Sequence, residues 1–387
     1  MATTEAEPAS PHLASQVLRS DSGSATRRRL GSGCAAVDAA LDGGLEYGRV
    51  SCISGEGGVG KTLLALHFIA KHLVSGREVQ ATVIDSVGTF DVFRLQEVVL
   101  SRLRDMGQHD ETKQTHTDAG VTTERVPEDE ILDRVKLMRV FDIEGLLEAL
   151  DELKTETESA LDDLRKLRND AATDKQLEIP DSEDEGDEML FDEVSPLEPS
   201  PSDMTNLPGE AAAKEGLLVI DNITSVINPL LKRNYVQAQA QLTEVLRALS
   251  QLARSSNMCI LLINTAMSPR SNHTVSVKKS TQMLDHPSPE EMSSLSSQLE
   301  SISIFESATV RPALGKTLSN AVDLYLLAHM LPKHKRDADM FYNTELGSKH
   351  RAELVNILEV LSDRWDQRVG NFGAFTVKGG IQLEDAF

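Results

Sequence analysis

The sequence has few aromatic side chains, which make up only 4% of its 387 residues. Proteins that hold single-stranded nucleic acid commonly stack the bases on several aromatic side chains, so a surface built mainly in this way is not expected. The formal net charge of −22 at pH 7 also disfavours binding to nucleic acid through bulk attraction. Much of this charge, however, lies in the acidic segment that contains residues 181–188, so the rest of the chain is less repulsive than the total suggests.

Cysteine is scarce, and long apolar runs are missing. Cys34, Cys52 and Cys259 are far apart and form neither a CxxC pair nor a cluster with histidine. A disulfide framework and a zinc site are therefore not expected, and Cys52 and Cys259, in apolar runs, are expected to be core thiols of a reducing compartment, cytosol or nucleus. No run reaches about 18 apolar residues, so no membrane contact through a spanning helix is expected. The N-terminus also lacks an apolar signal core.

A phosphate-binding loop is present at residues 55–62, which fit the pattern G-x-x-x-x-G-K-[ST] at every fixed position. The loop follows an apolar stretch at 50–54 and precedes an apolar-periodic run at 63–74, which is the strand–loop–helix context that the motif requires. Glycines let consecutive backbone N–H groups turn toward one anion at a helix N-terminus. The alternative is a glycine-rich turn followed by Lys-Thr by chance. The predicted nucleotide contacts are Gly55, Glu56, Gly57, Gly58, Val59, Gly60, Lys61 and Thr62.

A second element completes this predicted site. The apolar stretch 217–220 ends in Asp221, and in P-loop proteins a carboxylate at the end of such a strand lies beside the loop and helps to hold Mg2+. Lys61 would reach the β- and γ-phosphates, and the Thr62 hydroxyl would ligate the metal. The predicted cofactors are therefore ATP and Mg2+, with Thr62 and Asp221 as the metal ligands.

Apolar strand-like segments alternate with helix-like segments along the chain. Strands are expected at 82–85, 135–141, 217–220, 258–263, 322–328, 354–360 and 375–381, and helices at 91–103, 143–153 and 236–253. This alternation predicts an α/β fold whose sheet is mostly parallel and flanked by helices. Residues 1–28 are expected to be a disordered tail, and the core, 29–387, is expected to be interrupted by disordered insertions at about 105–130, 155–215 (acidic) and 268–310 (Ser-rich). The acidic insertion is expected to start as an extension of the preceding helix before it reaches the run 181–188.

Several of these segments together resemble the RecA-like recombinases, and most closely the D-type among the eukaryotic recombinase paralogues of homologous recombination. Residues 31–45 and 48–50 look like the family's segment before the phosphate loop. Residues 84–90, Ile-Asp-Ser-Val-Gly-Thr-Phe, look like its I-D-T-E-G-T-F element, and 311–317 contain its P-A-L-G element. The stretch 217–231 resembles the D-type paralogue. The resemblance covers about residues 30–385 outside the insertions.

The resemblance implies a RecA-like P-loop core that binds ATP with Mg2+. It also implies a heteromeric complex with other recombinase paralogues, which assists recombinase assembly on single-stranded DNA during DNA repair, and hence a place in the nucleus among proteins that respond to DNA damage. Arg94 would stack on adenine by analogy with the matching family position, although it could equally be a solvated helix arginine. The arginines at 27–29 are a weak nuclear address or, as the sequence alone favours, a solvated linker.

Three departures from the family pattern change the expectations. The family's water-orienting glutamate is replaced by Val87, so at most a weak DNA-dependent ATPase is expected, unless Asp85 or Asp91 takes over that role. Asn264 is followed by Thr265 and alanine, which weakens the expected link to the γ-phosphate. Finally, only about 28 residues precede the core, so growth into a long filament of identical subunits is not expected.

Two DNA-contacting loops are implied by the same resemblance. The first corresponds to 230–236, where Lys232 and Arg233 would contact phosphates and Tyr235 would stack on a base. The second corresponds to about 267–310 and contains Arg270, Lys278 and Lys279. A charged helix cap and a disordered loop are the even alternatives. For the whole protein, the alternatives are a P-loop switch ATPase outside recombination and a non-enzymatic scaffold with a vestigial site.

Overall fold

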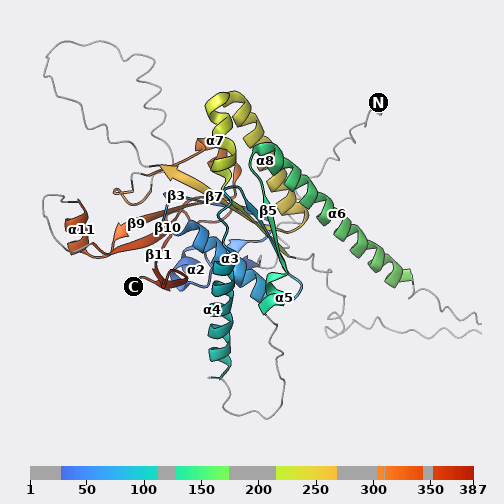
Figure 1. Ribbon diagram of the computed structural model, residues 1–387, viewed down its shortest axis with the longest axis horizontal. Helices are drawn as coiled ribbons and strands as arrows, with labels where there is room; N and C mark the ends of the chain where they lie inside the picture. Colours follow the sequence, from blue (N-terminus) through green and yellow to red (C-terminus); the bar gives the residue numbers. More distant parts are fainter. Residues whose placement is uncertain (1–27, 112–127, 174–214, 268–302, 309, 343–351) are drawn as a thin grey trace, which may run out of the picture.

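A computed structural model of the chain describes residues 28–111, 128–173, 215–267, 303–308, 310–342 and 352–387. In this part of the chain a ten-stranded sheet has the order β12-β11-β10-β9-β3-β7-β6-β4-β5, with β8 paired to β7 outside that path (Figure 1). A separate two-stranded sheet joins β1 (Arg29–Leu30) to β2 (Leu45–Glu46). The strands of the large sheet are β3 (Val50–Gly55), β4 (Gln80–Asp85), β5 (Val135–Arg139), β6 (Gly216–Asp221), β7 (Cys259–Met267), β8 (Arg311–Pro312), β9 (Leu324–Pro332), β10 (Leu354–Asp363), β11 (Phe372–Lys378) and β12 (Gln382–Asp385).

The half of the sheet from β5 to β9 is parallel, and the half from β9 to β12 is antiparallel. Strand β3 lies between β7 and β9, and all six of its residues are buried. Buried parallel strands are continuous apolar runs because helices cover both faces of the sheet. The expected fold class, α/β with a mostly parallel sheet flanked by helices, is confirmed.

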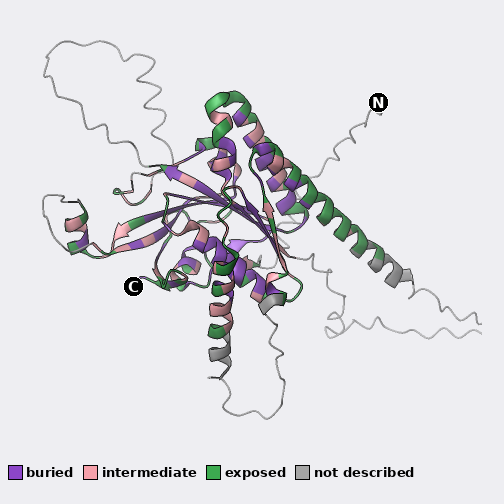
Figure 2. Cartoon of the chain, in the orientation of Figure 1, coloured by how far each residue is buried: buried purple, intermediate pink, exposed green. Residues whose placement is uncertain are grey.

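Helices cover both faces of the sheet and form two apolar cores (Figure 2). One core contains side chains such as Leu64 and Phe68 of α3, and the other contains side chains such as Ile227 of α7 and Leu249 of α8. The helices are α2 (Ala35–Ala40), α3 (Lys61–Ser75), α4 (Val92–Glu111), α5 (Glu128–Leu132), α6 (Ile143–Thr173), α7 (Ile223–Arg233), α8 (Tyr235–Ser255), α10 (Gly315–Ala321) and α11 (Lys335–Tyr342). None of the helices in the described ranges is long and apolar enough to cross a membrane.

The helices differ from the expected ones at their ends. Helix α6 continues to Thr173, so the helix extension that was expected at the start of the acidic insertion, from residue 155, reaches that residue. Helix α4 likewise continues to Glu111, past residue 105. The remaining parts of the three expected insertions, 112–127, 174–214 and 268–302, lie outside the described residues, as do residues 1–27 of the expected tail. Arg28, counted with that tail, forms an ion pair with Glu215 at 2.5 Å.

One segment is a junction of two helices. Residues 230–236 were expected to be a DNA-contacting loop or, equally, a charged helix cap. Helix α7 continues to Arg233 and α8 begins at Tyr235, so only Asn234 separates the two helices. The Asn234 side chain accepts a hydrogen bond from the backbone N–H of Gln237, at 3.2 Å, and caps α8. The alternative of a charged helix cap is therefore the one that describes this segment, because one capping asparagine is sufficient to end one helix and begin the next.

Candidate nucleotide-binding site

The residues of the predicted site meet at one edge of the sheet. Strands β3, β6 and β4 end at Gly55, Asp221 and Asp85, and Asp85 lies directly opposite Asp221 in the register of β4 and β6. The carboxyl ends of parallel strands meet at the same edge, where open α/β sheets commonly bind ligands. The phosphate-binding loop leaves β3 at this edge and leads into α3 at Lys61.

The glycines of the loop leave a concave backbone surface. Gly58 and Gly60 have φ angles of 84° and 85°, which residues with a Cβ atom rarely adopt. A Cβ atom at Gly57 or Gly58 would meet no atom within 4 Å, so this side of the loop is open. By contrast, a Cβ at Gly55 would lie 2.5 Å from the carbonyl oxygen of Ala328, so the base of the loop packs tightly on β9. The result is a rigidly seated backbone cradle with free space in front of it.

Three polar side chains adjoin this cradle. The Thr62 Oγ1 donates a hydrogen bond to Asp221 Oδ2 at 2.7 Å, and the Lys61 Nζ donates to the carbonyl oxygen of Glu56 at 2.5 Å. Burial raises the pKa of Asp221, against the opposing effects of the Thr62 hydrogen bond and the Lys61 charge. Burial also lowers the pKa of Lys61, against the attraction of Asp221 and Glu56. The hydroxyl, carboxylate and amine thus lie together, which is a donor set suited to a triphosphate and a divalent cation.

The buried carboxylate of Asp85 holds the backbone of the segment after β4. Asp85 Oδ1 accepts hydrogen bonds from the backbone N–H groups of Val87, Gly88 and Thr89, at 3.1, 2.7 and 3.3 Å, and Oδ2 accepts one from Phe90 at 3.0 Å. Burial alone would raise the pKa of Asp85, but these donors outweigh it and lower the pKa. The Val87 side chain is half-exposed. Asp85 therefore holds the backbone and is not free to orient a water molecule.

Asp91 and Arg94 also have defined partners. Asp91 Oδ1 accepts a hydrogen bond from the backbone N–H of Arg94 at 3.1 Å, so Asp91 caps the start of α4. The Arg94 Nη2 donates to the carbonyl oxygen of Gly380 at 2.5 Å, in the turn between β11 and β12. The guanidinium is thus held beside this turn, and its contact with adenine stays a prediction.

A buried polar network, which sequence reasoning missed, joins the strand ends. Asn264 is fully buried, and its Nδ2 donates to Ser54 Oγ at 2.9 Å and to the carbonyl oxygen of Ala313 at 3.0 Å. On the next residue, Thr265 Oγ1 accepts a hydrogen bond from Asn222 Nδ2 at 3.4 Å. The network links β3 of the phosphate loop to β7 and to the Pro-Ala-Leu-Gly element. The signal for it was an asparagine directly after the apolar run 259–263, in a position expected to be buried.

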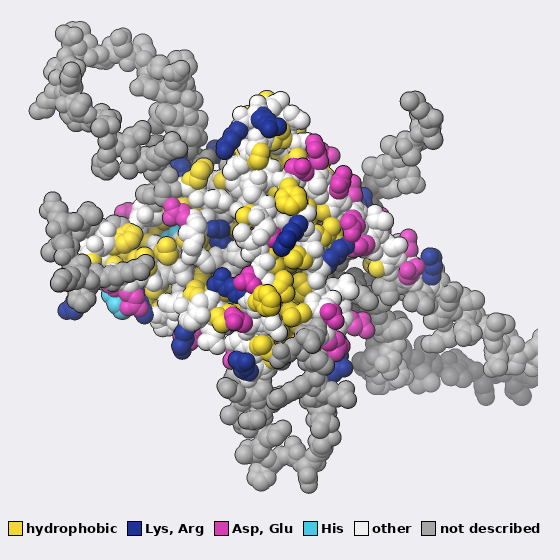
Figure 3. Space-filling model, in the orientation of Figure 1, with side chains coloured by type: hydrophobic (Ala, Val, Ile, Leu, Met, Phe, Trp, Pro, Cys, Tyr) yellow, Lys and Arg dark blue, Asp and Glu magenta, His cyan; other side chains and the backbone are white. Residues whose placement is uncertain are grey.

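The candidate DNA contacts lie at the junction of α7 and α8, where basic side chains gather at the tip of the helices (Figure 3). Lys232 and Arg233 occupy the last turn of α7, and Tyr235 is the first residue of α8 and is 65% exposed. All three residues are exposed. Arg270, Lys278 and Lys279 lie outside the described residues.

Comparison with known proteins gives a distant relative. No family model matches the chain. A curated protein of Bos taurus, "DNA repair protein RAD51 homolog 4", is 23% identical over 235 residues, which are 61% of this chain and 52% of that protein. The chain therefore spans about half the length of the curated relative it matches.

One solved structure is also similar. The crystal structure of the RadB recombinase has a TM-score of 0.48 and 17% sequence identity, and the similarity covers 92% of this chain and 99% of that chain.

Proposed function

We propose that this chain is an ATP-binding recombinase paralogue of the D-type that acts in homologous-recombination DNA repair in the nucleus. It joins a heteromeric complex with other recombinase paralogues and assists recombinase assembly on single-stranded DNA. The observation that carries this proposal is the contact of Thr62 with Asp221 beside Lys61, at the mouth of an open glycine cradle. The distant similarity to a DNA repair protein supports the biological setting.

The residues that would hold ATP and Mg2+ follow from this arrangement. The backbone N–H groups of 55–62 would surround the phosphates, Lys61 would exchange its bond to the Glu56 carbonyl for phosphate oxygens, and Thr62 and Asp221 would hold the cation. When bound, Mg2+ supplies positive charge that neutralises the phosphate oxygens. The expected contact of Arg94 with adenine requires the guanidinium to reach the base from beside Gly380.

The same site is expected to turn ATP over slowly. A water molecule needs an acceptor that aligns it and takes its proton, and Val87 has neither a lone pair nor a charge. The neighbouring carboxylates of Asp85 and Asp91 are bonded to backbone N–H groups. Binding without rapid hydrolysis suits a subunit in which ATP is a structural ligand between paralogues.

Contact with single-stranded DNA would involve the exposed residues of the α7–α8 junction. Lys232 and Arg233 would neutralise phosphates, and Tyr235 would offer an aromatic face for one base. Arg270, Lys278 and Lys279 would add charge from the second expected DNA-contacting segment. So few contacts give modest binding that weakens with salt, which fits a role inside a complex rather than alone.

Nucleotide binding and turnover test the proposal together. In equilibrium binding of ATP with Mg2+, Lys61→Ala should weaken affinity by about 30-fold or more, because alanine cannot donate a charge-assisted hydrogen bond to phosphate. Val87→Glu should raise turnover above the slow rate of the unchanged protein. Val92→Glu is the matched control, since it adds the same carboxylate on a similarly exposed valine at the start of α4.

Other results would favour the alternatives. Rapid turnover without DNA would indicate a switch ATPase outside recombination, and absence of nucleotide binding would indicate a scaffold with a vestigial site. An unchanged affinity in Lys61→Ala would remove the site assignment itself. Purification of the chain with its natural partners, followed by identification of those subunits, tests the heteromeric complex.

A further inference from the structure

His67 of α3 is a buried histidine whose two ring nitrogens both have partners. It is 3% exposed, and its Nε2 lies 2.8 Å from the carbonyl oxygen of Ile381, while its Nδ1 lies 2.8 Å from Arg102 Nη2. A carbonyl oxygen only accepts and a guanidinium only donates, so Nε2 carries the hydrogen and Nδ1 accepts. Burial lowers the pKa of His67 to about 4, as do the charges of Arg102 and Arg94, against the hydrogen bond to Ile381. The ring is therefore neutral near pH 7 and has one fixed tautomer.

The Ile381 carbonyl belongs to the turn between β11 and β12, and this turn also holds Arg94. The carbonyl oxygen of the preceding residue, Gly380, accepts the hydrogen bond from Arg94 Nη2 at 2.5 Å. Gly379 and Gly380 have φ angles of 59° and 79°, and a Cβ atom at either would meet no atom within 4 Å. The turn therefore faces open space. Its two adjacent carbonyls connect the buried His67 to Arg94 in the first turn of α4.

The same turn is connected to the phosphate-binding loop and to α4. A Cβ atom at Gly60, the last glycine of the loop, would lie 3.6 Å from the ring of Phe375, which is fully buried in β11. Gln382, the first residue of β12, donates a hydrogen bond to Ser101 Oγ of α4 at 2.9 Å. His67 itself follows Lys61 on α3 by six residues, which is about 9 Å along the helix axis. The loop, α3, α4 and the turn are thus one connected unit on one side of the candidate site.

We propose that His67 is a positioning residue for the base of the bound nucleotide: it holds the 379–381 turn, and the turn holds the Arg94 guanidinium where it can lie against adenine. This role rests on the proposed binding of ATP to the phosphate loop. A free arginine side chain loses rotamer entropy when a ligand orders it, and a guanidinium that is already held loses less. Without the bond from His67, the Ile381 carbonyl has no fixed partner in α3, and the turn no longer holds Arg94 in one place.

The test is equilibrium binding of ATP and of inorganic tripolyphosphate, each with Mg2+, to the full chain near pH 7. The unchanged protein should bind ATP more tightly, because tripolyphosphate has no base for Arg94. His67→Asn keeps an acceptor near the Nδ1 position for Arg102 but is too short to reach the Ile381 carbonyl. It should weaken ATP binding by about fivefold, the size of an arginine–ring contact, and leave tripolyphosphate binding unchanged. His67→Gln keeps a donor near the Nε2 position and should bind ATP as the unchanged protein does.

A double variant shows whether His67 acts through Arg94. Arg94→Ala should weaken ATP binding by about as much as His67→Asn does, again without an effect on tripolyphosphate. Because both substitutions remove the same contact with the base, the double variant should bind ATP no more weakly than Arg94→Ala alone.

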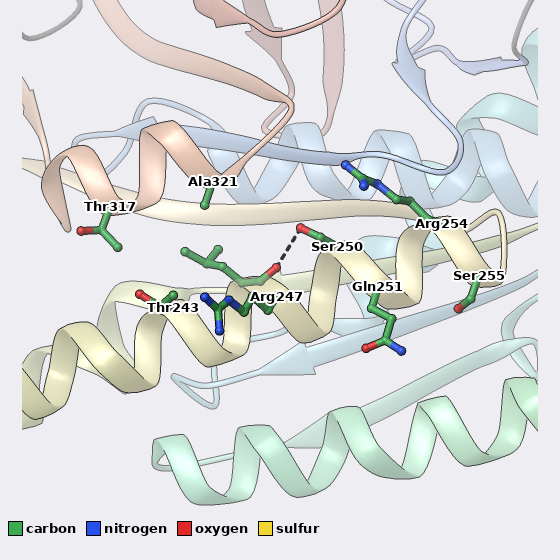
Figure 4. A pocket seen from close by; sticks show the side chains of 9 residues that line it. Thr243, Arg247, Ser250, Gln251, Arg254, Ser255, Thr317 and Ala321 are labelled. Atoms are coloured by element: carbon green, nitrogen blue, oxygen red, sulfur yellow. Dashed lines mark hydrogen bonds between the residues drawn. The ribbon is translucent and has the colours of Figure 1, made fainter. Parts of the chain in front are cut away.

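Two matched controls separate this role from general effects on the fold. His72 is also buried on α3, its Nε2 lies 3.1 Å from the carbonyl oxygen of Gln80, and burial lowers its pKa to about 4, so His72→Asn removes an equivalent bond. Arg247 lines a cavity of about 750 Å³ between α8 and α10, and none of the described lining residues comes from the phosphate loop, α3 or α4 (Figure 4). His72→Asn and Arg247→Ala should bind both ligands as the unchanged protein does.

Several results would overturn the proposal. They are equal losses of affinity for ATP and tripolyphosphate in His67→Asn, a fivefold loss for ATP in His67→Gln or His72→Asn, and a further loss when His67→Asn is added to Arg94→Ala. Weaker ATP binding in Arg247→Ala would place the nucleotide in the cavity between α8 and α10. An unchanged protein that binds neither ligand would refute the proposed ATP site itself. If the positioning role alone is wrong, the unchanged protein binds both ligands.

Discussion

Replacing Asp85 by asparagine distinguishes a carboxylate that holds the backbone from one that activates water. Asp85 is 2% exposed and accepts four backbone N–H groups between Val87 and Phe90. Asparagine has the same shape but keeps one acceptor oxygen and has no charge. If the asparagine oxygen takes the Oδ1 position, the asparagine NH2 group takes the Oδ2 position and faces the backbone N–H of Phe90. Two hydrogen-bond donors then face each other, and the hydrogen bond to Phe90 is lost.

The magnitude follows from these four hydrogen bonds. A hydrogen bond to a charged acceptor contributes about 1.5–3 kcal/mol, and a donor left without a partner costs a similar amount. Removing the Phe90 bond and weakening those that remain should lower the free energy of unfolding by about 2–4 kcal/mol. Asp91→Asn is the matched control, because Asp91 accepts a single N–H at a helix start, where asparagine is as good a cap as aspartate.

Urea unfolding of the three proteins measures the effect, and acid provides an internal check. The folded protein lowers the pKa of Asp85, so its contribution to stability is present above the ordinary carboxyl pKa of about 4. That contribution is lost as the pH falls through the lowered value, so the difference from Asp85→Asn should shrink in acid. Equal stabilities of the two asparagine variants at pH 7 would refute the reasoning. Loss of ATP turnover in Asp85→Asn with unchanged stability would instead assign Asp85 to the chemistry.

Two further predictions concern DNA and pH. In single-stranded DNA binding, Lys232→Ala with Arg233→Ala should reduce the slope of log affinity against log salt by about 0.7 for each phosphate that the protein no longer neutralises, whereas Arg336→Ala should leave it unchanged. His72 is fully buried, with Nδ1 2.8 Å from Tyr47 Oη, and burial lowers its pKa to about 4, against the hydrogen bond to the Gln80 carbonyl. Because the folded state requires the neutral ring, the free energy of unfolding should fall by up to about 3 kcal/mol as the pH drops from about 6.5 to 4. His72→Gln should flatten that part of the profile, and an equally steep fall in this variant would assign the pH dependence to other groups.

The meeting of Thr62 and Asp221 could be predicted from the sequence, although the residues are far apart in the chain. Both follow apolar runs that form parallel strands, and parallel strands end at the same edge of a sheet. The role of Asp85 could not be predicted in this way. The sequence shows a carboxylate two residues before Val87, but only the folded backbone shows that four N–H groups turn toward it.

The helices after β6 show why the sequence left both a loop and a helix cap open at 230–236. Pro229 and Asn234 are typical of chain breaks, yet Pro229 lies inside α7 and Asn234 caps α8. Val226 and Ile227 of α7 are buried against the sheet, and this packing outweighs the hydrogen bond that the proline cannot make. The antiparallel direction of β10 to β12 was also missing from the prediction, because an apolar run does not reveal the direction of a strand.

Strand β7 gives the proposed nucleotide and DNA contacts a common structural support. Its Asn264 contacts Ser54 in the strand that precedes the phosphate loop. Farther along, Met267 pairs with Arg311 at the point where the chain leaves the described residues for 268–302. On the other side of that gap, Glu359 of β10 accepts hydrogen bonds from Ser303 Oγ at 2.6 Å and from the backbone N–H of Ile304 at 2.7 Å.

Met267, at the start of the second expected DNA-contacting segment, and Ser303 and Ile304 within it are thus bonded to the sheet that carries the phosphate loop. Coupling between two sites can pass through such contiguous hydrogen-bonded elements. If bound ATP alters the affinity for single-stranded DNA, a substitution that removes one of these hydrogen bonds should abolish that effect. ATP and DNA should each still bind to the variant. Asn264 is the link to examine, because its amide donates a buried side-chain hydrogen bond to Ser54 of β3, in addition to the parallel backbone pairing of β3 with β7.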